Sequence, residues 1–306
     1  MKKFVLLLLI VQLAIVGCSR QNDRPTSGET VNDVELPKCS DEGQCVYLVN
    51  RYSQKLLTYN PKTKSIEEQQ NIPNYIYYEY NTVSPFFTVG NSITNGFSIL
   101  KMDKNVVDEV VRLKDRKNEA IFPLATNNER HFFIHSYYDD SGKETKRAIA
   151  ELIQDRTQDI PNVSGLVSDG AIVKDKLYYT VYNESSNSFE LQSLLLDNLQ
   201  AAPHTEAENL ESGNVYSLNG ELLTSNNELI FNDSMQFEKK TLNYIEDELN
   251  ILIQIYPNEQ ADLVLDVIDT ASKKQIGSVS GVIDFSIDQR VVTVYCEGRI
   301  EHINIP

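Results

Sequence analysis

The sequence has no tryptophan, three methionines and four histidines, and it lacks the short motifs that mark common enzyme sites. It contains no G-x-x-x-x-G-K-[ST], H-E-x-x-H, G-x-S-x-G or C-x-x-C pattern, which argues against a P-loop nucleotide hydrolase, a zincin protease, an α/β-hydrolase and a thioredoxin-like oxidoreductase. A long amphipathic helix is missing as well. We therefore predict no catalytic residues, although an activity built from residues far apart in the sequence would leave no motif.

The chain also lacks an apolar run long enough to cross a membrane. The longest run, Phe4–Val16, follows the cationic start Met1–Lys3 and is shorter than the roughly 20 residues that a spanning helix needs. A charged start, a short apolar middle and a small residue after it are typical of a secretory signal.

This apolar run ends at a cysteine. The stretch Ile15-Val16-Gly17-Cys18 resembles the bacterial lipobox, in which the cysteine is acylated and becomes the new N-terminus. The resemblance implies a signal peptide over residues 1–17 and acyl chains such as palmitate on Cys18. It implies a protein that is lipid-anchored in a bacterial membrane and faces outside the cytoplasm. The alternative is an ordinary signal peptide with an incidental cysteine.

The residues after Cys18 are polar and small. Residues 18–32 have almost no apolar side chains, so they cannot offset the entropy of folding, and we predict a flexible linker. The globular domain is predicted over residues 33–306. The formal net charge of −16 predicts that this domain does not bind nucleic acid.

Three cysteines remain after Cys18. Cys39 and Cys45 enclose the polar loop SDEGQ, and we predict that they form a disulfide in an exported protein. Cys296 ends the apolar run VVTVYC, where a lone cysteine is usually a small buried residue.

The body of the chain consists of short β-type segments with a repeat. A strongly apolar strand recurs at intervals in the forties, with one shorter fifth unit. It begins near Val46, Phe86, His131 or Phe132, Leu177, Glu221, Asn250 and Val291. Each such strand is followed by a polar turn, a second strand, another turn and a more polar strand.

Two units carry a more specific pattern. Tyr59-Asn60 is followed by a Lys-Thr-Lys turn and Ile66, and Ile268-Asp269 is followed by a polar turn and Ile276. These units resemble the repeat of bacterial YncE-like (YVTN-type) and TolB-like β-propellers, which implies an all-β propeller fold.

The count of recurring strands predicts seven blades, with six or eight left open. A pair of β-sandwiches is the competing fold. The segment 33–37 is either the innermost strand of the first blade or the missing outer strand of the last one, which has three strands over residues 282–306.

The densest aromatic stretch is NYIYYEYN, residues 74–81. We predict that Tyr75, Tyr77, Tyr78 and Tyr80 contribute to a ligand site if this strand lines the central channel, and packing between blades is the alternative. The acidic stretch 204–214 is predicted to be a solvated loop.

Two stretches contain residue types that can bind metal ions. His131 and His135 lie four residues apart on a predicted strand, about 13 Å, which is too far for one ion. One surface and one partly buried histidine are predicted there instead. The stretch YYDDSGKE, residues 137–144, lacks the spacing of a known calcium loop and predicts a hairpin turn. No cofactor is predicted, with calcium or another divalent metal as the alternative.

These features predict a membrane-anchored, extracytoplasmic propeller that acts as a binding or scaffold module for a protein, peptide or glycan of the cell envelope. The first alternative is a metal-dependent hydrolase or lactonase of the propeller type. The second is a surface lipoprotein for immunity or sensing. Fold alone does not decide among them.

Overall fold

The computed structural model describes residues 46–50, 55–60, 62–63, 65–68, 75–78, 86–91, 96–103, 106–113, 118–127, 129–154 and 156–306. The regular elements across these residues are β-strands. Within these ranges no helix is long and apolar enough to cross a lipid bilayer. The predictions for residues 1–17, 18–32 and 33–37, and for Cys18, Cys39, Cys45 and Tyr80, concern residues outside the described ranges.

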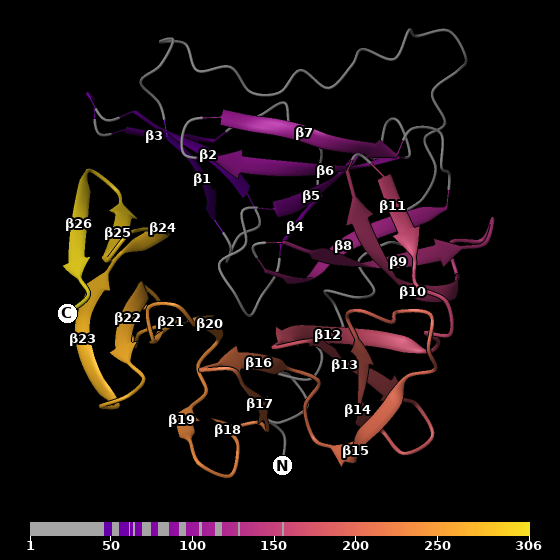
Figure 1. The fold of residues 1–306 in the computed structure, drawn as a ribbon. Coiled ribbons are helices and arrows are strands. Elements are labelled where there is room, and N and C mark those ends of the chain that lie inside the picture. Colours follow the sequence, from indigo (N-terminus) through magenta and orange to yellow (C-terminus); the bar gives the residue numbers. More distant parts are fainter. Residues whose placement is uncertain are drawn as a thin grey trace, which may run out of the picture. The chain divides into compact units, whose positions relative to one another are not determined.

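The described strands form seven antiparallel sheets, numbered here sheets 1 to 7 in chain order (Figure 1). Strands that are neighbours in space are also neighbours in sequence, so every sheet is a meander. Sheet 1 contains β1 (Val46–Asn50), β2 (Lys55–Asn60) and β3 (Ser65–Glu68). Sheet 2 contains β4 (Tyr75–Tyr78), β5 (Phe86–Asn91), β6 (Gly96–Asp103) and β7 (Val106–Leu113). Sheet 3 contains β8 (Glu119–Thr126), β9 (His131–Tyr138), β10 (Glu144–Ile153) and β11 (Arg156–Asp159).

The remaining four sheets follow the same plan. Sheet 4 contains β12 (Leu166–Val173), β13 (Lys176–Asn183), β14 (Ser188–Leu195) and β15 (His204–Leu210). Sheet 5 contains β16 (Val215–Leu218), β17 (Glu221–Ser225), β18 (Leu229–Phe231) and β19 (Gln236–Glu238). Sheet 6 contains β20 (Leu242–Glu246), β21 (Ile251–Pro257), β22 (Leu263–Asp269) and β23 (Lys274–Ser280). Sheet 7 contains β24 (Val282–Asp288), β25 (Val291–Cys296) and β26 (Arg299–Asn304).

The recurring apolar strands of the sequence are strands of the structure. They correspond to β1, β5, β9, β13, β17, β21 and β25, one in each sheet, and from sheet 2 onward each is the second strand. The short fifth unit is the small sheet 5, whose last two strands have three residues each. The three strands predicted for the last unit are also present.

The turns after several strands share one hydrogen-bonding pattern. Asn60 accepts hydrogen bonds from the backbone N–H groups of Lys62 and Thr63, at 3.0 and 3.3 Å, and Asp269 accepts one from Ser272 at 2.6 Å. A short side chain that bonds the backbone two or three residues ahead closes the turn locally. The two sequence patterns ending in Asn60 and Asp269 are therefore confirmed as Asx turns that lead from β2 to β3 and from β22 to β23.

From sheet 2 onward, contacts between sheets follow chain order. β5 contacts β8, β8 contacts β12, β12 contacts β16, β16 contacts β20, and β22 contacts β24. β24 in turn contacts β1, so the last sheet packs against the first. A succession of three- and four-stranded meanders that pack on one another and return to the beginning is the arrangement of a β-propeller.

The core consists of apolar layers between neighbouring sheets. One cluster joins sheets 3 and 4 through Phe132, Ile149 and Tyr179, each at most 1% exposed. Another joins sheets 6 and 7 through Ile253 and Val294. Each fully buried aliphatic or aromatic side chain contributes about 1.5 to 3 kcal/mol, so both faces of a sheet need an apolar neighbour.

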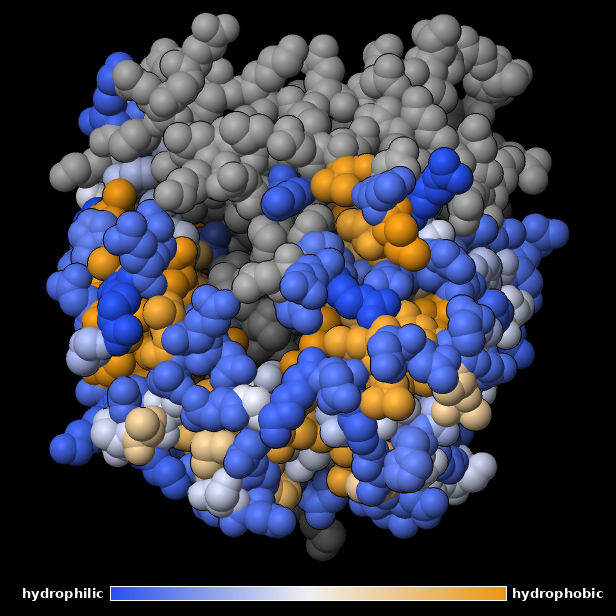
Figure 2. Space-filling model, in the orientation of Figure 1, coloured by the Kyte–Doolittle hydropathy of each residue, from blue (hydrophilic) through white to orange (hydrophobic). Residues whose placement is uncertain are grey.

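The acidic stretch 204–214 does not form the predicted loop over its whole length. Residues His204–Leu210 are β15, the fourth strand of sheet 4, and most of its residues are exposed. Charged residues suit an exposed edge strand because they oppose pairing with other chains. In Figure 2, hydrophilic residues cover most of the lower part of the view, where Figure 1 places β14, β15, β18 and β19.

Candidate functional site

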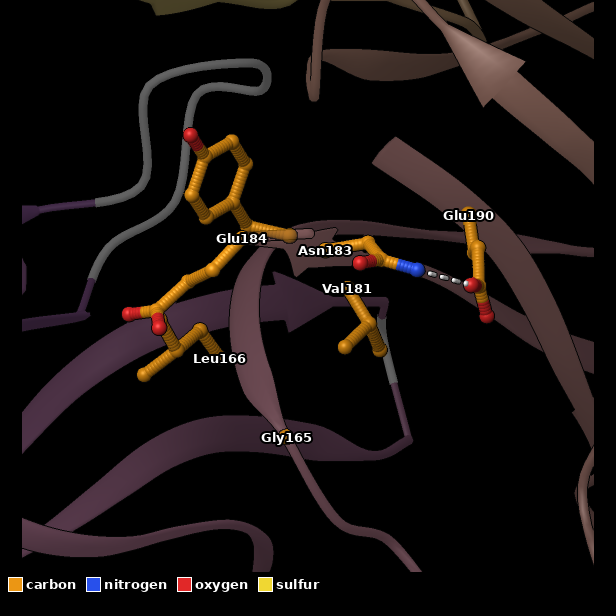
Figure 3. A pocket seen from close by; sticks show the side chains of 7 residues that line it. Gly165, Leu166, Val181, Asn183, Glu184 and Glu190 are labelled. Atoms are coloured by element: carbon orange, nitrogen blue, oxygen red, sulfur yellow. Dashed lines mark hydrogen bonds between the residues drawn. The ribbon is translucent and has the colours of Figure 1, made fainter. Parts of the chain in front are cut away.

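Sheet 4 contains a pocket of about 410 Å³ at the end where its first strand begins (Figure 3). Three strands contribute to it, because the start of β12, the end of β13 and the start of β14 meet at the same end of an antiparallel sheet. The lining residues are Gly165, Leu166, Val181, Tyr182, Asn183, Glu184 and Glu190.

The floor of this pocket requires a glycine. Gly165 has a φ of +97°, and a Cβ there would lie 2.6 Å from Cγ1 of Val181. Any other residue would therefore be strained and would collide with the strand beneath it. The close approach of the chain before β12 to β13 is specified by this one position.

The rim is organised by Asn183, the last residue of β13. Its Oδ1 accepts hydrogen bonds from the backbone of Ser185 and Ser186, at 3.0 and 3.4 Å, which closes the turn. Its Nδ2 donates to Oε1 of Glu190 at 3.0 Å, as the dashed line in Figure 3 shows. The carboxylate of Glu190 is thus held at the pocket wall, while Glu184 is exposed beside it.

The charged side chains that line the pocket are all acidic. Its two ionisable carboxyl side chains belong to Glu184 and Glu190, and no lysine, arginine or histidine is among the lining residues. The ring of Tyr182 adds an aromatic surface and packs 5.1 Å from the ring of Phe189. Carboxylates beside an aromatic ring favour a cationic ligand group.

A second polar cluster lies at the corresponding end of sheet 3. His135 on β9 is 2% exposed, and its two ring nitrogens lie 2.8 Å from Oε2 of Glu119 and 2.8 Å from Oδ1 of Asp159. The hydroxyl of Tyr137 donates to the other oxygen of Asp159 at 2.6 Å, and Nζ of Lys146 lies 3.3 Å from it. The imidazole thus has a carboxylate within hydrogen-bond distance of each ring nitrogen.

The cluster spans the sheet from its first to its fourth strand. Glu119 lies on β8 and Asp159 on β11, and β10 lies between His135 and Asp159. Ala148 on β10 pairs with His135, and Ala150 pairs with Asp159. Two alanines at these positions leave room for the imidazole to reach across β10.

The geometry shifts the pKa of one carboxyl group. Burial alone would raise the pKa of Asp159, but the hydrogen bonds from His135 and Tyr137 and the positive charge of His135 lower it to about 2. Asp159 therefore remains ionised far into the acid range. The cluster is a paired structural charge group.

Neither histidine of the 131–138 strand is a surface residue. His135 is buried as described, and His131 is partly buried with its Nδ1 bonded to the hydroxyl of Thr126. Burial, followed by the charge of Lys101, lowers the pKa of His131. The prediction of one partly buried histidine is confirmed for His131, but the prediction of a surface histidine was wrong, because His135 is buried between Glu119 and Asp159.

In the part of the chain that the structure describes, no three His, Cys, Asp or Glu side chains are grouped so that they could hold a metal ion. At the former calcium-loop candidate, Oδ1 of Asp139 accepts hydrogen bonds from the N–H groups of Ser141 and Lys143 at 2.9 and 3.0 Å. The predicted hairpin turn between β9 and β10 is confirmed.

A third polar contact joins sheets 4 and 5. Asp169 on β12 is 9% exposed, and its Oδ2 accepts hydrogen bonds from the backbone N–H of Val215 at 3.1 Å and from Nδ2 of Asn214 at 3.4 Å. Its Oδ1 accepts one from the N–H of Gly170 at 2.9 Å. One carboxylate thus fixes the beginning of β16 against β12.

The predicted site residues have different outcomes. Tyr75, Tyr77 and Tyr78 lie on β4, the first strand of sheet 2, and their role in ligand binding stays a prediction. The disulfide between Cys39 and Cys45 and the lipidation of Cys18 also stay predictions. Cys296 is confirmed as a buried free cysteine at 0% exposure, and burial raises the pKa of its thiol.

The residues of the pocket and of the two polar clusters were missed by sequence reasoning. They are dispersed in the sequence, but several of them lie at the end of a second strand or just after it. The recurring apolar strands therefore carried a usable signal: Tyr182, Asn183 and Glu184 follow LYYTV, and Tyr137 follows HFFIH closely.

Comparison with known proteins gave no match to a family model and no match to a curated protein. Among solved structures, apo AztD from Citrobacter koseri has a TM-score of 0.47 at 7% identity, over 86% of this chain and 94% of that chain. TolB from Acinetobacter baumannii has a TM-score of 0.37 at 8% identity, over 86% of this chain and 63% of that chain.

A candidate 6-phosphogluconolactonase from Bacteroides uniformis is a third similar structure. It has a TM-score of 0.42 at 13% identity, over 86% of this chain and 97% of that chain. All three TM-scores lie below 0.5, so the assignment of a β-propeller rests on the strand order and the sheet contacts of this chain.

Proposed function

We propose that this chain is a lipid-anchored, seven-bladed propeller of the bacterial envelope that binds a protein or peptide through a cationic group. The pocket of sheet 4 is the observation that carries the proposal. It offers two carboxylates and a tyrosine ring without a competing basic side chain. The net charge of −16 adds a long-range attraction for cations and opposes nucleic acid.

The pocket is tested by calorimetric titration with a capped tetralysine peptide at about 0.15 M salt, where distant charges are largely screened. The double variant Glu184→Gln/Glu190→Gln should weaken binding about fivefold or more, because two near charges are lost from the site. The amides keep the size of the side chains, so the shape of the pocket is preserved.

The matched control removes two charges from the same sheet at a distance from the pocket. Asp175 and Asp197 are exposed in the turns at the opposite end of sheet 4, and neither lines the pocket. The variant Asp175→Asn/Asp197→Asn should bind tetralysine within about twofold of the unchanged protein if the site is specific. If both double variants bind tetralysine equally weakly, binding depends only on the overall charge of the protein, which would contradict the proposed site.

The anchor has its own test. Cys18 follows an apolar run and Gly17 and precedes a polar linker, and this pattern supports acylation of its thiol. The substitution Cys18→Ala should move most of the protein from the membrane fraction to the soluble fraction. The alanine cannot be acylated, and each methylene of an acyl chain buried in the bilayer contributes about 0.8 kcal/mol to membrane binding. Immunoblots of separated fractions give the readout, and continued membrane association would contradict the lipobox assignment.

A further inference from the structure

Sheet 5 contains a cluster of two serines and a lysine that the proposed binding function does not use. Nζ of Lys239 lies 3.2 Å from Oγ of Ser212 and 3.2 Å from Oγ of Ser225. The two hydroxyl oxygens lie 3.0 Å from each other. The three residues come from the segment before β16, the end of β17 and the segment after β19, which meet at one end of sheet 5.

The surroundings of Lys239 are unusual for a lysine. The side chain is half-buried, and its other hydrogen-bond acceptors are Oδ1 of Asn214 at 2.9 Å and the carbonyl of Asn226 at 3.2 Å. All four acceptors are neutral, and among the described residues no carboxylate lies within ion-pair distance of Nζ. Lysines are rarely withdrawn from solvent without a charged partner.

These surroundings affect the protonation of the amine. Burial lowers the pKa of Lys239, and the negative charge of Asp169 offsets part of that effect. A lysine with a lowered pKa has a larger neutral fraction, and only the neutral amine accepts a proton from a neighbouring hydroxyl.

The two serines differ in access. Ser225 is 3% exposed, whereas Ser212 is only partly buried. The hydroxyl of Ser225 donates to Oγ of Ser212, so it orients that oxygen without reaching the surface. Ser212 is therefore the more exposed of the two serines.

We propose that Ser212 and Lys239 form a Ser–Lys nucleophilic site that accepts the acyl group of a carboxylic ester, with Ser225 as a positioning residue. Oγ of Ser212 attacks the carbonyl carbon, and its proton passes to the neutral Nζ of Lys239. The bond from the carbonyl carbon to the leaving alkoxide breaks, and the alkoxide takes that proton. Water then attacks the acyl-serine with the amine again as base, which returns the free hydroxyl and releases the carboxylic acid.

The experiment measures labelling of the full-length protein by an alkyl fluorophosphonate, with the modified residue located by mass spectrometry. Labelling forms the bond between Oγ and phosphorus, releases fluoride and moves the hydroxyl proton to Lys239. Ser212 should react about 100-fold faster than in the Lys239→Met variant, since a positioned general base typically contributes that much or more. Ser234, an exposed turn serine after β18, provides the internal comparison.

Two further measurements separate a nucleophilic site from a structural one. In the unchanged protein, the labelling rate of Ser212 should rise with pH to a plateau whose midpoint lies below the ordinary lysine value of about 10.4. Lys239→Arg keeps the positive charge but cannot act as a base, so it should fold and lose the labelling. Ser225→Ala should slow the labelling and change the pH midpoint.

The outcomes are distinct. Labelling of Ser212 no faster than that of Ser234, or equal labelling in Lys239→Arg, would overturn the proposal and leave the cluster as a structural contact. The pH profile uses the unchanged protein, so a variant that fails to fold does not prevent the test. Tetralysine binding to the pocket of sheet 4 does not involve these residues and can succeed or fail separately.

Discussion

Replacement of His135 by phenylalanine should lower the free energy of unfolding by about 2 to 4 kcal/mol. The phenyl ring is somewhat larger than the imidazole, so no cavity forms, and the main loss is that of the two hydrogen bonds to the carboxylates. Glu119 and Asp159, with side chains only 20% and 28% exposed, would each lose the imidazole hydrogen bond that the structure provides. The midpoint of urea unfolding at constant slope measures the difference.

A control and a rescue test the reason for this effect. His302 is exposed on β26, and His302→Phe should change stability by less than about 0.5 kcal/mol. Adding Asp159→Asn to His135→Phe should recover part of the loss, because a partly buried carboxylate that has lost its imidazole partner becomes a neutral amide. A double variant that is less stable than both single variants would contradict the assignment of the cluster as a paired charge group.

The same cluster predicts a pH dependence. Asp159 has a pKa of about 2 in the folded protein, against the ordinary 3.8. A lowered folded pKa stabilises the protein above the ordinary value, and this contribution disappears as the pH falls from about 4 towards 2. After allowance for partial exposure, we expect about 1 to 2 kcal/mol from this residue. The acid-induced loss of stability should be smaller in His135→Phe by about this amount.

Replacement of Asp169 by alanine should cost about 3 kcal/mol. The substitution leaves the N–H groups of Gly170 and Val215 without the acceptor that the structure provides, and each unsatisfied buried donor costs about 1 to 3 kcal/mol. Because Val215 begins β16, amide hydrogen exchange should accelerate first at the start of this strand. Urea unfolding and residue-resolved exchange provide the two measurements.

The matched control for Asp169 is another aspartate-to-alanine change. Asp197 is exposed in the turn after β14, so Asp197→Ala should remain within about 0.5 kcal/mol of the unchanged protein. Asp169→Asn retains one acceptor oxygen and should fall between the two. Equal stability of Asp169→Ala and Asp197→Ala would show that the contact between β12 and β16 does not depend on the carboxylate.

The sequence alone determined the repeating architecture. A strand with apolar residues on both faces must be covered on both sides, and seven such strands at regular spacing predicted the seven described sheets. The turns at Asn60 and Asp269 were equally readable, because an Asx turn is closed by residues two or three positions away. Local periodicity and local hydrogen bonds are properties that a sequence carries by itself.

Predictions for a single strand were incomplete where they left out the strands that pair with it. Residues 204–210 looked like a solvated loop because they are acidic, yet β14 provides the partner that makes them a strand. His131 and His135 looked separately accessible because their strand was considered without β8 and β10. In both cases the missing information was the identity of the neighbouring strand.

Only the tertiary structure decided where the chemistry lies. His135 meets Asp159 from 24 residues away because β10 offers alanines between them, and Ser212 meets Lys239 from 27 residues away because the ends of three segments converge on sheet 5. No spacing in the sequence encodes these pairs, since the lengths of the intervening strands and turns set the distance. The prediction at Cys18 is the opposite case, because its proposed role depends on adjacent residues alone.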